Sequence, residues 1–112
     1  IWWDSRFPVI FAGDTNLRPG SVGYAKMVRN FRDTFDEVGE YRYFANGMTR
    51  NSDGCNLSKA AVFPECRVDH VLLSSRAPWR TVRWGLDVFR YPETRGFVSD
   101  HRALVVELAS QR

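Results

Sequence analysis

The chain has 112 residues, and a composition of 44% hydrophobic and 26% charged residues is that of one folded domain rather than a disordered chain. No apolar run approaches the roughly 18 residues that a membrane-spanning helix needs, which excludes a transmembrane segment. The formal net charge of +3 is a modest excess that points only weakly toward nucleic acid.

The first predicted element begins close to the start of the chain. Because the chain starts at Ile1 without a methionine and enters a strand-like segment within a few residues, we interpret it as a fragment. Residues 7–13 (FPVIFAG) are mostly apolar, with β-branched and aromatic members, and predict a buried strand. The polar residues Asp14, Thr15 and Asn16 follow directly, where that strand ends.

Two helical segments are predicted next. Ser21 is a suitable N-cap residue for the first of them. Apolar side chains then recur at the i, i+3, i+4 and i+7 spacing of one helix face: Tyr24, Met27, Val28 and Phe31. Residues 33–38 predict a second, short helical turn that Gly39 closes.

Strands dominate the rest of the chain. Extended segments are predicted at residues 40–44, 67–75, 81–91 and 102–109, separated by loops at 46–57 and 92–99. Trp84 and Phe89 are expected in the core. A strand, two helices and then several strands indicate an α/β or α+β fold.

The cysteines and the basic residues leave compartment and ligand open. Cys55 and Cys66 could close a small loop or remain free thiols, and no Cys/His spacing resembles a zinc site. If the chain is a fragment, the absence of a visible signal peptide says nothing about localisation, which stays unknown. All 16 basic residues except Lys26 and Lys59 are arginine. Arginine suits a phosphoester ligand, although a GC-rich genome would produce the same bias.

Three small polar clusters lie at the ends of apolar strands: residues 13–16 (GDTN), 67–69 (RVD) and 99–101 (SDH). Each cluster alone is explained by turn and capping roles. Together they supply what phosphodiester hydrolysis needs, namely carboxylates for a metal, a base for water and donors for the phosphoryl oxygens. Magnesium prefers one or two carboxylates plus waters, which Asp14 or Asp100 could supply.

The alternation of a strand separates Asp69 from its neighbour His70, because successive side chains point to opposite faces. A histidine that contacts phosphate usually needs a carboxylate to orient its second nitrogen, and Asp69 is the candidate for His101. If Asp69 faces the site, His70 cannot. We therefore interpret His70 as a structural residue.

The ordered motifs GDTN (Asp14 and Asn16), RVDH (Asp69) and SDH (Asp100 and His101) resemble the endonuclease/exonuclease/phosphatase (DNase I-like) superfamily. This resemblance implies a metal-dependent phosphoester hydrolase, above all a phosphodiesterase or nuclease, with Mg²⁺ or Mn²⁺ as cofactor. It also implies in-line attack of an activated water on phosphorus. DNA, RNA, phosphotyrosyl-DNA, sphingomyelin and inositol phosphates are all handled by this scaffold, so the substrate stays open.

The resemblance implies a role for each matched residue. Asp14 would position or deprotonate the attacking water, and Asn16 would contact the substrate and stabilise the pentacovalent phosphoryl group. Asp69 would form a hydrogen-bonded pair with His101, which would contact a non-bridging phosphate oxygen. Asp100 would lie at or near the metal, with Asp14 as a second metal residue.

The stretch of residues 9–18 (VIFAGDTNLR) looks most like the second type of tyrosyl-DNA phosphodiesterase. In those enzymes an arginine at the position of Arg18 approaches the nucleic-acid backbone. The resemblance therefore implies that Arg18 binds substrate, whereas a solvated loop arginine is the alternative.

The chain departs from the family in one important way. Members carry an Asn and a Glu, the latter a principal magnesium ligand, in an N-terminal half to which no segment here corresponds. The resemblance thus implies that residues 1–112 are the C-terminal half of one four-layer α/β/β/α sandwich with mixed sheets, supplying one sheet and its covering helix. Such a half would expose a large apolar face, need the missing half or self-association, and show little activity alone.

Two other interpretations remain open. The chain could be a non-catalytic, Arg-rich nucleic-acid-binding remnant, which would bind with a steep salt dependence and hydrolyse nothing. A pure binder has no need of five catalytic-type residues, which argues against this interpretation. The chain could also be a truncated fragment with no function of its own.

Overall fold

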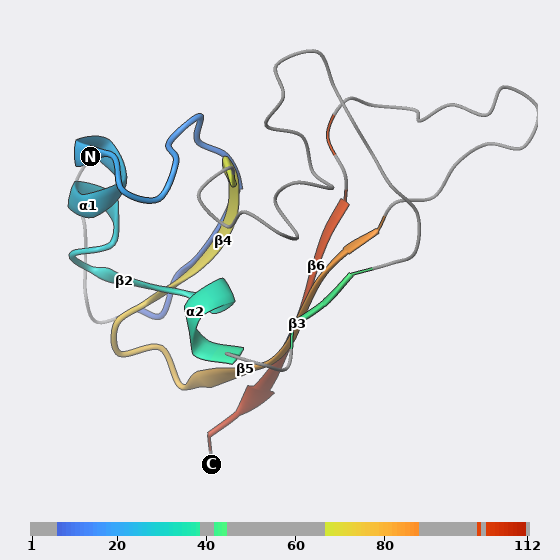
Figure 1. Ribbon diagram of the computed structural model, residues 1–112. Helices are drawn as coiled ribbons and strands as arrows, with labels where there is room; N and C mark the ends of the chain where they lie inside the picture. The colour runs from blue at the N-terminus through green and yellow to red at the C-terminus, as the bar shows by residue number, and fades with distance from the viewer. Residues whose placement is uncertain (1–6, 39–41, 45–66, 88–100, 102, 112) are drawn as a thin grey trace, which may run out of the picture.

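The computed structural model describes residues 7–38, 42–44, 67–87, 101 and 103–111. In this part of the chain the fold is α+β, which confirms the predicted class. Its elements follow in the order β1 (Ile10–Asp14), α1 (Val22–Met27), β2 (Phe31–Asp33), α2 (Thr34–Val38), β3 (Arg42–Phe44), β4 (Asp69–Ser74), β5 (Trp79–Asp87) and β6 (Ala103–Ser110) (Figure 1).

The strands divide between two three-stranded sheets. The first sheet has the order β1-β4-β2 and is antiparallel throughout. The second has the order β3-β5-β6 and is mixed, because β3 and β5 run parallel while β5 and β6 run antiparallel. The prediction that the chain supplies one sheet was wrong. The sheet that a strand joins depends on its pairing with strands far away in the sequence, which local patterns do not reveal. The complete four-layer sandwich stays a prediction.

The register between β1 and β4 determines which side chains share a face. Asp14 lies opposite Asp69, and two residues further along Ala12 lies opposite Val71. Directly opposed side chains of antiparallel strands point to the same face of the sheet. Two carboxylates therefore occupy one end of this face, and small or apolar side chains follow behind them.

Strand β1 is exposed along its whole length, although residues 7–13 predict a buried strand. It lies at the edge of its sheet, with β4 as its partner in the described part of the chain. Phe7, Ile10 and Phe11 are among the exposed large hydrophobic residues. An apolar sequence predicts a strand that is suited to burial, but the elements that cover a strand are decided by tertiary contacts.

The first helix is shorter than its apolar spacing predicts. Ser21 caps it as predicted, because the Ser21 hydroxyl accepts a hydrogen bond from the Tyr24 amide at 3.1 Å. The helix ends at Met27, and Phe31 begins β2 instead of completing the helical face. Pairing with β4, which sets Phe31 opposite Ser74, overrides the local periodicity.

The second helix begins one residue later than predicted, at Thr34, because Asp33 ends strand β2. The Asp33 carboxylate accepts a hydrogen bond from the Phe35 amide at 2.9 Å and so satisfies one of the first backbone donors. The helix contacts both β4 and β5 and lies between the two sheets in Figure 1.

The core lies where α2 meets the second sheet. Phe35 meets Trp84 edge-on, with ring centroids 4.8 Å apart, and both side chains are buried as the prediction for Trp84 requires. The rest of this cluster is apolar and comes from α2, β5 and β6: Val38, Leu86, Leu104 and Val106. This cluster joins the second sheet to α2, the helix that follows strand β2 of the first sheet.

Strands β3, β4, β5 and β6 confirm the extended segments predicted in the second half of the chain. Several predictions fall outside the described residues: Gly39, Cys55, Cys66, Phe89, Asp100 and the loops at 46–57 and 92–99. Neither α1 nor α2 has the length and apolar character that crossing a membrane requires, and these are the helices that the described residues form.

Candidate active site

Three titratable side chains from three segments meet at one end of the first sheet. Asp14 is the last residue of β1 and Asp69 is the first residue of β4, so the antiparallel pairing sets them side by side. His101 lies two residues before β6, and that strand belongs to the second sheet. The site is therefore built where the two sheets approach each other.

His101 is held between the two carboxylates. Its Nδ1 lies 2.8 Å from Asp69 Oδ2, a hydrogen bond in which the ring nitrogen donates to the carboxylate. Its Nε2 points toward Asp14, 3.8 Å from Oδ2 of that residue. The side chains of Asp14 and His101 are 37% and 40% exposed, whereas that of Asp69 is 20% exposed. The hydrogen-bonded pair of Asp69 and His101 that the resemblance implies is present.

The same three residues suit a divalent cation. One ligand atom from each of Asp14, Asp69 and His101 can lie within 4.8 Å of the others. Two carboxylates and an imidazole match the preferences of several divalent metals, and carboxylate oxygens are the ligands that Mg²⁺ and Mn²⁺ favour. Each carboxylate has a second oxygen beyond the one that accepts a hydrogen bond from Asn16 or His101. The donor set therefore fits a metal bound mainly through oxygen.

The loop after β1 orients Asp14. The Asn16 amide donates a hydrogen bond to Asp14 Oδ1 at 2.9 Å, which forms a local side-chain turn. Asn16 has a φ of 52°, a left-handed conformation that asparagine tolerates better than most residues. The Thr15 amide and hydroxyl both donate to the Val68 carbonyl, at 2.9 and 3.1 Å. Asn16 thus orients the Asp14 carboxylate through its backbone amide, and the predicted contact of Asn16 with substrate stays a prediction.

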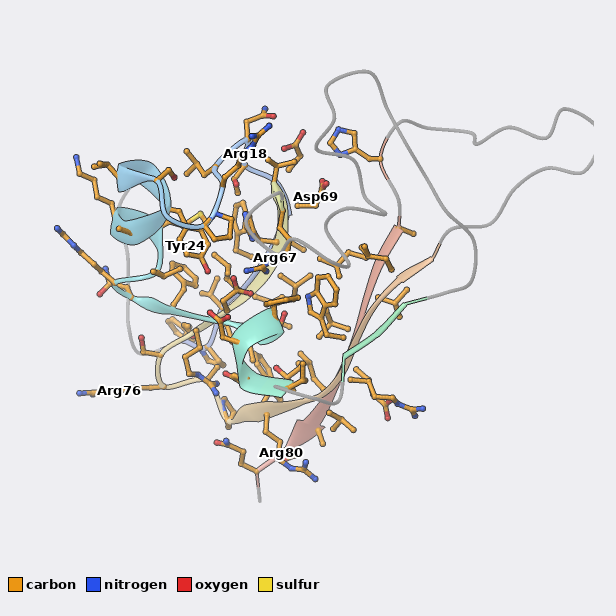
Figure 2. All side chains as sticks on the ribbon, in the orientation of Figure 1. Arg18, Tyr24, Arg67, Asp69, Arg76 and Arg80 are labelled. Atoms are coloured by element: carbon orange, nitrogen blue, oxygen red, sulfur yellow. The ribbon has the colours of Figure 1, made fainter. Side chains whose placement is uncertain are left out.

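Arg18 lies in this loop and is exposed. Its backbone carbonyl accepts a hydrogen bond from the Ser21 amide at 3.0 Å, which joins the loop to the start of α1. Figure 2 shows Arg18 at the same end of the molecule as Asp69, whereas Arg76 and Arg80 lie at the opposite end. Arg18 therefore lies on the side of the site, and its contact with substrate stays a prediction.

His70 lies on the other face of β4, buried, as the alternation of the strand predicts. Its Nε2 donates to the Leu17 carbonyl at 2.8 Å, and its ring packs against Tyr24 with centroids 5.3 Å apart. The Leu17 side chain in turn packs so closely on Gly23 that an added Cβ would lie 2.7 Å from it. His70 is thus structural, and what it anchors is the loop that carries Asn16 and Arg18.

A buried polar cluster that sequence reasoning missed supports the start of β4. Asp33 accepts hydrogen bonds from the Tyr24 hydroxyl and from Arg67, whose Nη1 lies 3.2 and 3.4 Å from the two carboxylate oxygens. The Arg67 guanidinium also stacks on Phe35, 3.7 Å from the ring centroid. Asp33 and Arg67 are 34 residues apart, and no local pattern links them.

Tyr24 is held as a hydrogen-bond donor in this cluster. Burial of the phenol raises its pKa well above the ordinary value, and the hydrogen bond to the Asp33 carboxylate raises it further. The phenol therefore stays protonated through the range in which most proteins are studied. The Tyr24 hydroxyl therefore remains a hydrogen-bond donor to Asp33, as does the guanidinium of Arg67.

Replacing His70 with alanine is expected to lower the free energy of unfolding by about 2 kcal/mol or more, because the Leu17 carbonyl loses its donor and a cavity forms. His70→Gln, whose amide nitrogen can donate to the same carbonyl, is expected to recover part of this loss. Urea unfolding measures the stability, and the amide chemical shift of Asn16 reports on the loop. An Asn16 shift that does not move in His70→Ala would contradict the anchoring role.

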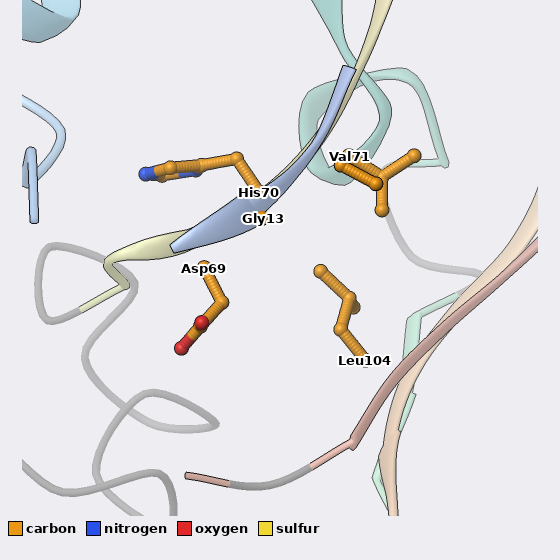
Figure 3. A pocket seen from close by; sticks show the side chains of 6 residues that line it. Gly13, Asp69, His70, Val71 and Leu104 are labelled. Carbon is orange, nitrogen blue, oxygen red and sulfur yellow. The ribbon is translucent and has the colours of Figure 1, made fainter. Parts of the chain in front are cut away.

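A pocket of about 290 Å³ has Asp69, one of the three site residues, in its lining. It lies between the first sheet and β6, and its described lining consists of Ala12, Gly13, Asp69, His70, Val71 and Leu104. Figure 3 shows Asp69 and Leu104 on one side of the paired strands and the His70 ring on the other. The pocket is therefore continuous with the carboxylate end of the site.

Comparisons with known proteins give one informative likeness. No family model matches the chain, and no curated protein matches it either. Among solved structures, the chain is similar to a mannosyl-6-phosphatase from Bacteroides thetaiotaomicron, with a TM-score of 0.61 and 29% sequence identity. The match covers 94% of this chain and 39% of that protein. The chain thus spans well under half the length of the structure that it resembles.

Proposed function

We propose that this chain carries part of the catalytic site of a metal-dependent phosphoester hydrolase. The observation that carries the proposal is the convergence of Asp14, Asp69 and His101, with the His101 ring hydrogen-bonded to one carboxylate and turned toward the other. The likeness to a phosphatase supports it independently of this geometry. Membership of the endonuclease/exonuclease/phosphatase superfamily, inferred from the three motifs, is part of the same proposal.

In the proposed reaction, Asp14 accepts a proton from the attacking water. The water oxygen bonds to phosphorus in line with the ester oxygen that leaves. A phosphomonoester and water then give phosphate and an alcohol, and a phosphodiester and water give a phosphomonoester and an alcohol. The leaving alcohol takes its proton from solvent. Protonated His101 donates from Nε2 to a non-bridging oxygen, while Asp69 orients the ring through Nδ1.

A divalent cation would be held by Asp14 and Asp69, and by Asp100, which lies outside the described residues. When bound, it would neutralise the negative charge that develops on the phosphoryl oxygens. We propose Mg²⁺, with Mn²⁺ as the alternative, because the available ligands are mainly carboxylate oxygens.

The substrate class has two candidates. The three motifs favour a phosphodiester such as DNA, with Arg18 near the backbone. The phosphatase likeness favours a phosphomonoester, since that protein is described as a mannosyl-6-phosphatase. A nucleic-acid-binding chain without activity is the opposing hypothesis, and it predicts salt-sensitive binding and no hydrolysis.

Chelation of divalent metal is expected to abolish hydrolysis, and added Mg²⁺ is expected to restore it. The complete protein should be assayed with 4-nitrophenyl phosphate and bis(4-nitrophenyl) phosphate, which separate monoester from diester activity. Readdition of Ca²⁺ and Mn²⁺ serves as a comparison for metal preference. Turnover that persists unchanged in excess chelator would contradict metal dependence, and no turnover of either ester with Mg²⁺ or Mn²⁺ would contradict the proposed function.

A further inference from the structure

The pocket beside Asp69 is lined mainly by small or apolar residues, which the binding of a phosphate group does not require. We propose that this pocket binds an uncharged ring in the alcohol part of the phosphoester. The inference rests on the proposed function and deepens it, because it names the chemical character of the group that is esterified. Four of the six lining residues are small or apolar: Ala12, Gly13, Val71 and Leu104.

The pocket lies in line with the site along the paired strands. Asp14 and Asp69 are opposite each other, and Ala12 and Val71 form the next pair on the same face. Two residues along a strand correspond to about 7 Å. A phosphate held beside Asp14 and Asp69 would therefore place the first atoms of its ester group over Ala12 and Val71.

The charge of the lining selects against a second anionic group. No arginine or lysine is among the described residues that line the pocket, and Asp69 contributes a carboxylate at its edge. A second phosphate or a carboxylate would lose its hydration there without a counter-charge. An uncharged ring instead covers apolar surface on Val71 and Leu104 and gains the usual free energy of apolar burial.

The volume of the pocket is sufficient for a single ring. At about 290 Å³ the pocket is at the lower end of the range for small-molecule sites, which is roughly 300–1,000 Å³. Such a volume accommodates a single ring. The same pocket therefore accounts for an ester of a monocyclic alcohol.

Two non-hydrolysable probes test the inference in the complete protein with Mg²⁺ present. Phenylphosphonate carries a ring next to its phosphonate, and methylphosphonate carries the same charged group without the ring. Calorimetric titration is expected to show phenylphosphonate binding about tenfold more tightly. Phenylphosphonate is also expected to shift the methyl NMR signals of Val71 and Leu104, which methylphosphonate leaves in place.

A matched pair of variants locates the effect. Ala12→Leu places a larger side chain in the pocket and is expected to abolish the advantage of phenylphosphonate over methylphosphonate. Ala103→Leu makes the same change on β6 at an exposed position beside Leu104 and should behave as the unsubstituted protein. Circular dichroism confirms that both variants are folded.

The outcomes separate this inference from the proposed function. If methylphosphonate binds but phenylphosphonate gains nothing, the ring pocket is overturned and the phosphate site stands. If both probes bind and Ala12→Leu keeps the full difference, the ring lies elsewhere and the inference is again overturned. If neither phosphonate binds, the proposed function fails and the inference fails with it.

Discussion

Replacing His101 with alanine is expected to lower metal-dependent phosphoester turnover about a thousandfold. The ring bridges Asp69 and Asp14, so the variant loses the donor to the phosphoryl oxygen and leaves both carboxylates without their shared neighbour. Asp14→Ala is expected to cost a similar factor, because the attacking water then has no base. The measurement is kcat/KM of the complete protein on the better of the two nitrophenyl esters.

Asp69→Asn tests the role of the Asp69 carboxylate, which orients the His101 ring at the same site. The amide keeps the shape of Asp69 but does not hold the His101 ring in the orientation that a carboxylate acceptor imposes. We therefore expect a large loss of turnover with little change in stability. Glu107→Ala, at an exposed position on β6, is the control and should keep full activity. Near-normal activity of a folded His101→Ala variant would rule out the assignment of the site.

Replacing Asp33 with alanine is expected to lower the free energy of unfolding by about 3–5 kcal/mol. The side chains of Asp33 and Arg67 are 2% and 4% exposed, so the substitution leaves a buried guanidinium without its carboxylate. Tyr24 and the Phe35 amide lose an acceptor at the same time. Urea unfolding followed by tryptophan fluorescence measures the change, since Trp84 is in the adjoining core.

An exposed ion pair provides the matched control for this prediction. Arg83 and Glu107 also join two segments, but their side chains are 62% and 49% exposed. Glu107→Ala should therefore cost at most about 1 kcal/mol. The double variant Asp33→Ala with Arg67→Met should be less destabilised than Asp33→Ala alone, because no buried charge remains unpaired. Equal losses for Asp33→Ala and Glu107→Ala would show that burial does not determine the cost.

Local sequence signals predicted those elements whose cause is itself local. The Ser21 cap formed as expected, because it requires only a hydroxyl three residues before the Tyr24 amide. The opposite orientations of Asp69 and His70 also followed from strand alternation alone. Helical spacing wrongly predicted that Phe31 belongs to a helix. Phe31 instead pairs with Ser74, and local spacing does not reveal a contact between residues so far apart in the chain.

The candidate site was predictable as a set of residues but not as a geometry. The motifs singled out Asp14, Asp69 and His101, which the structure brings together, while Asp100 lies outside the described residues. The distances among these three side chains depend on the pairing of β1 with β4. They also depend on the start of β6, a strand of the second sheet, lying beside that pair. Neither the anchor from His70 to Leu17 nor the cluster around Asp33 has a signal in the sequence.

The sequence by itself indicated an α/β or α+β class, the main strands and the polar residues at their ends, because these follow from side-chain type and short-range spacing. Tertiary structure alone decided the division into two sheets, the exposure of β1 and the position of His101 between two carboxylates. It also decided that Ala12 and Val71 lie behind those carboxylates and line a pocket. The physical reason is that these features arise from contacts between residues far apart in the chain, which local propensity does not encode.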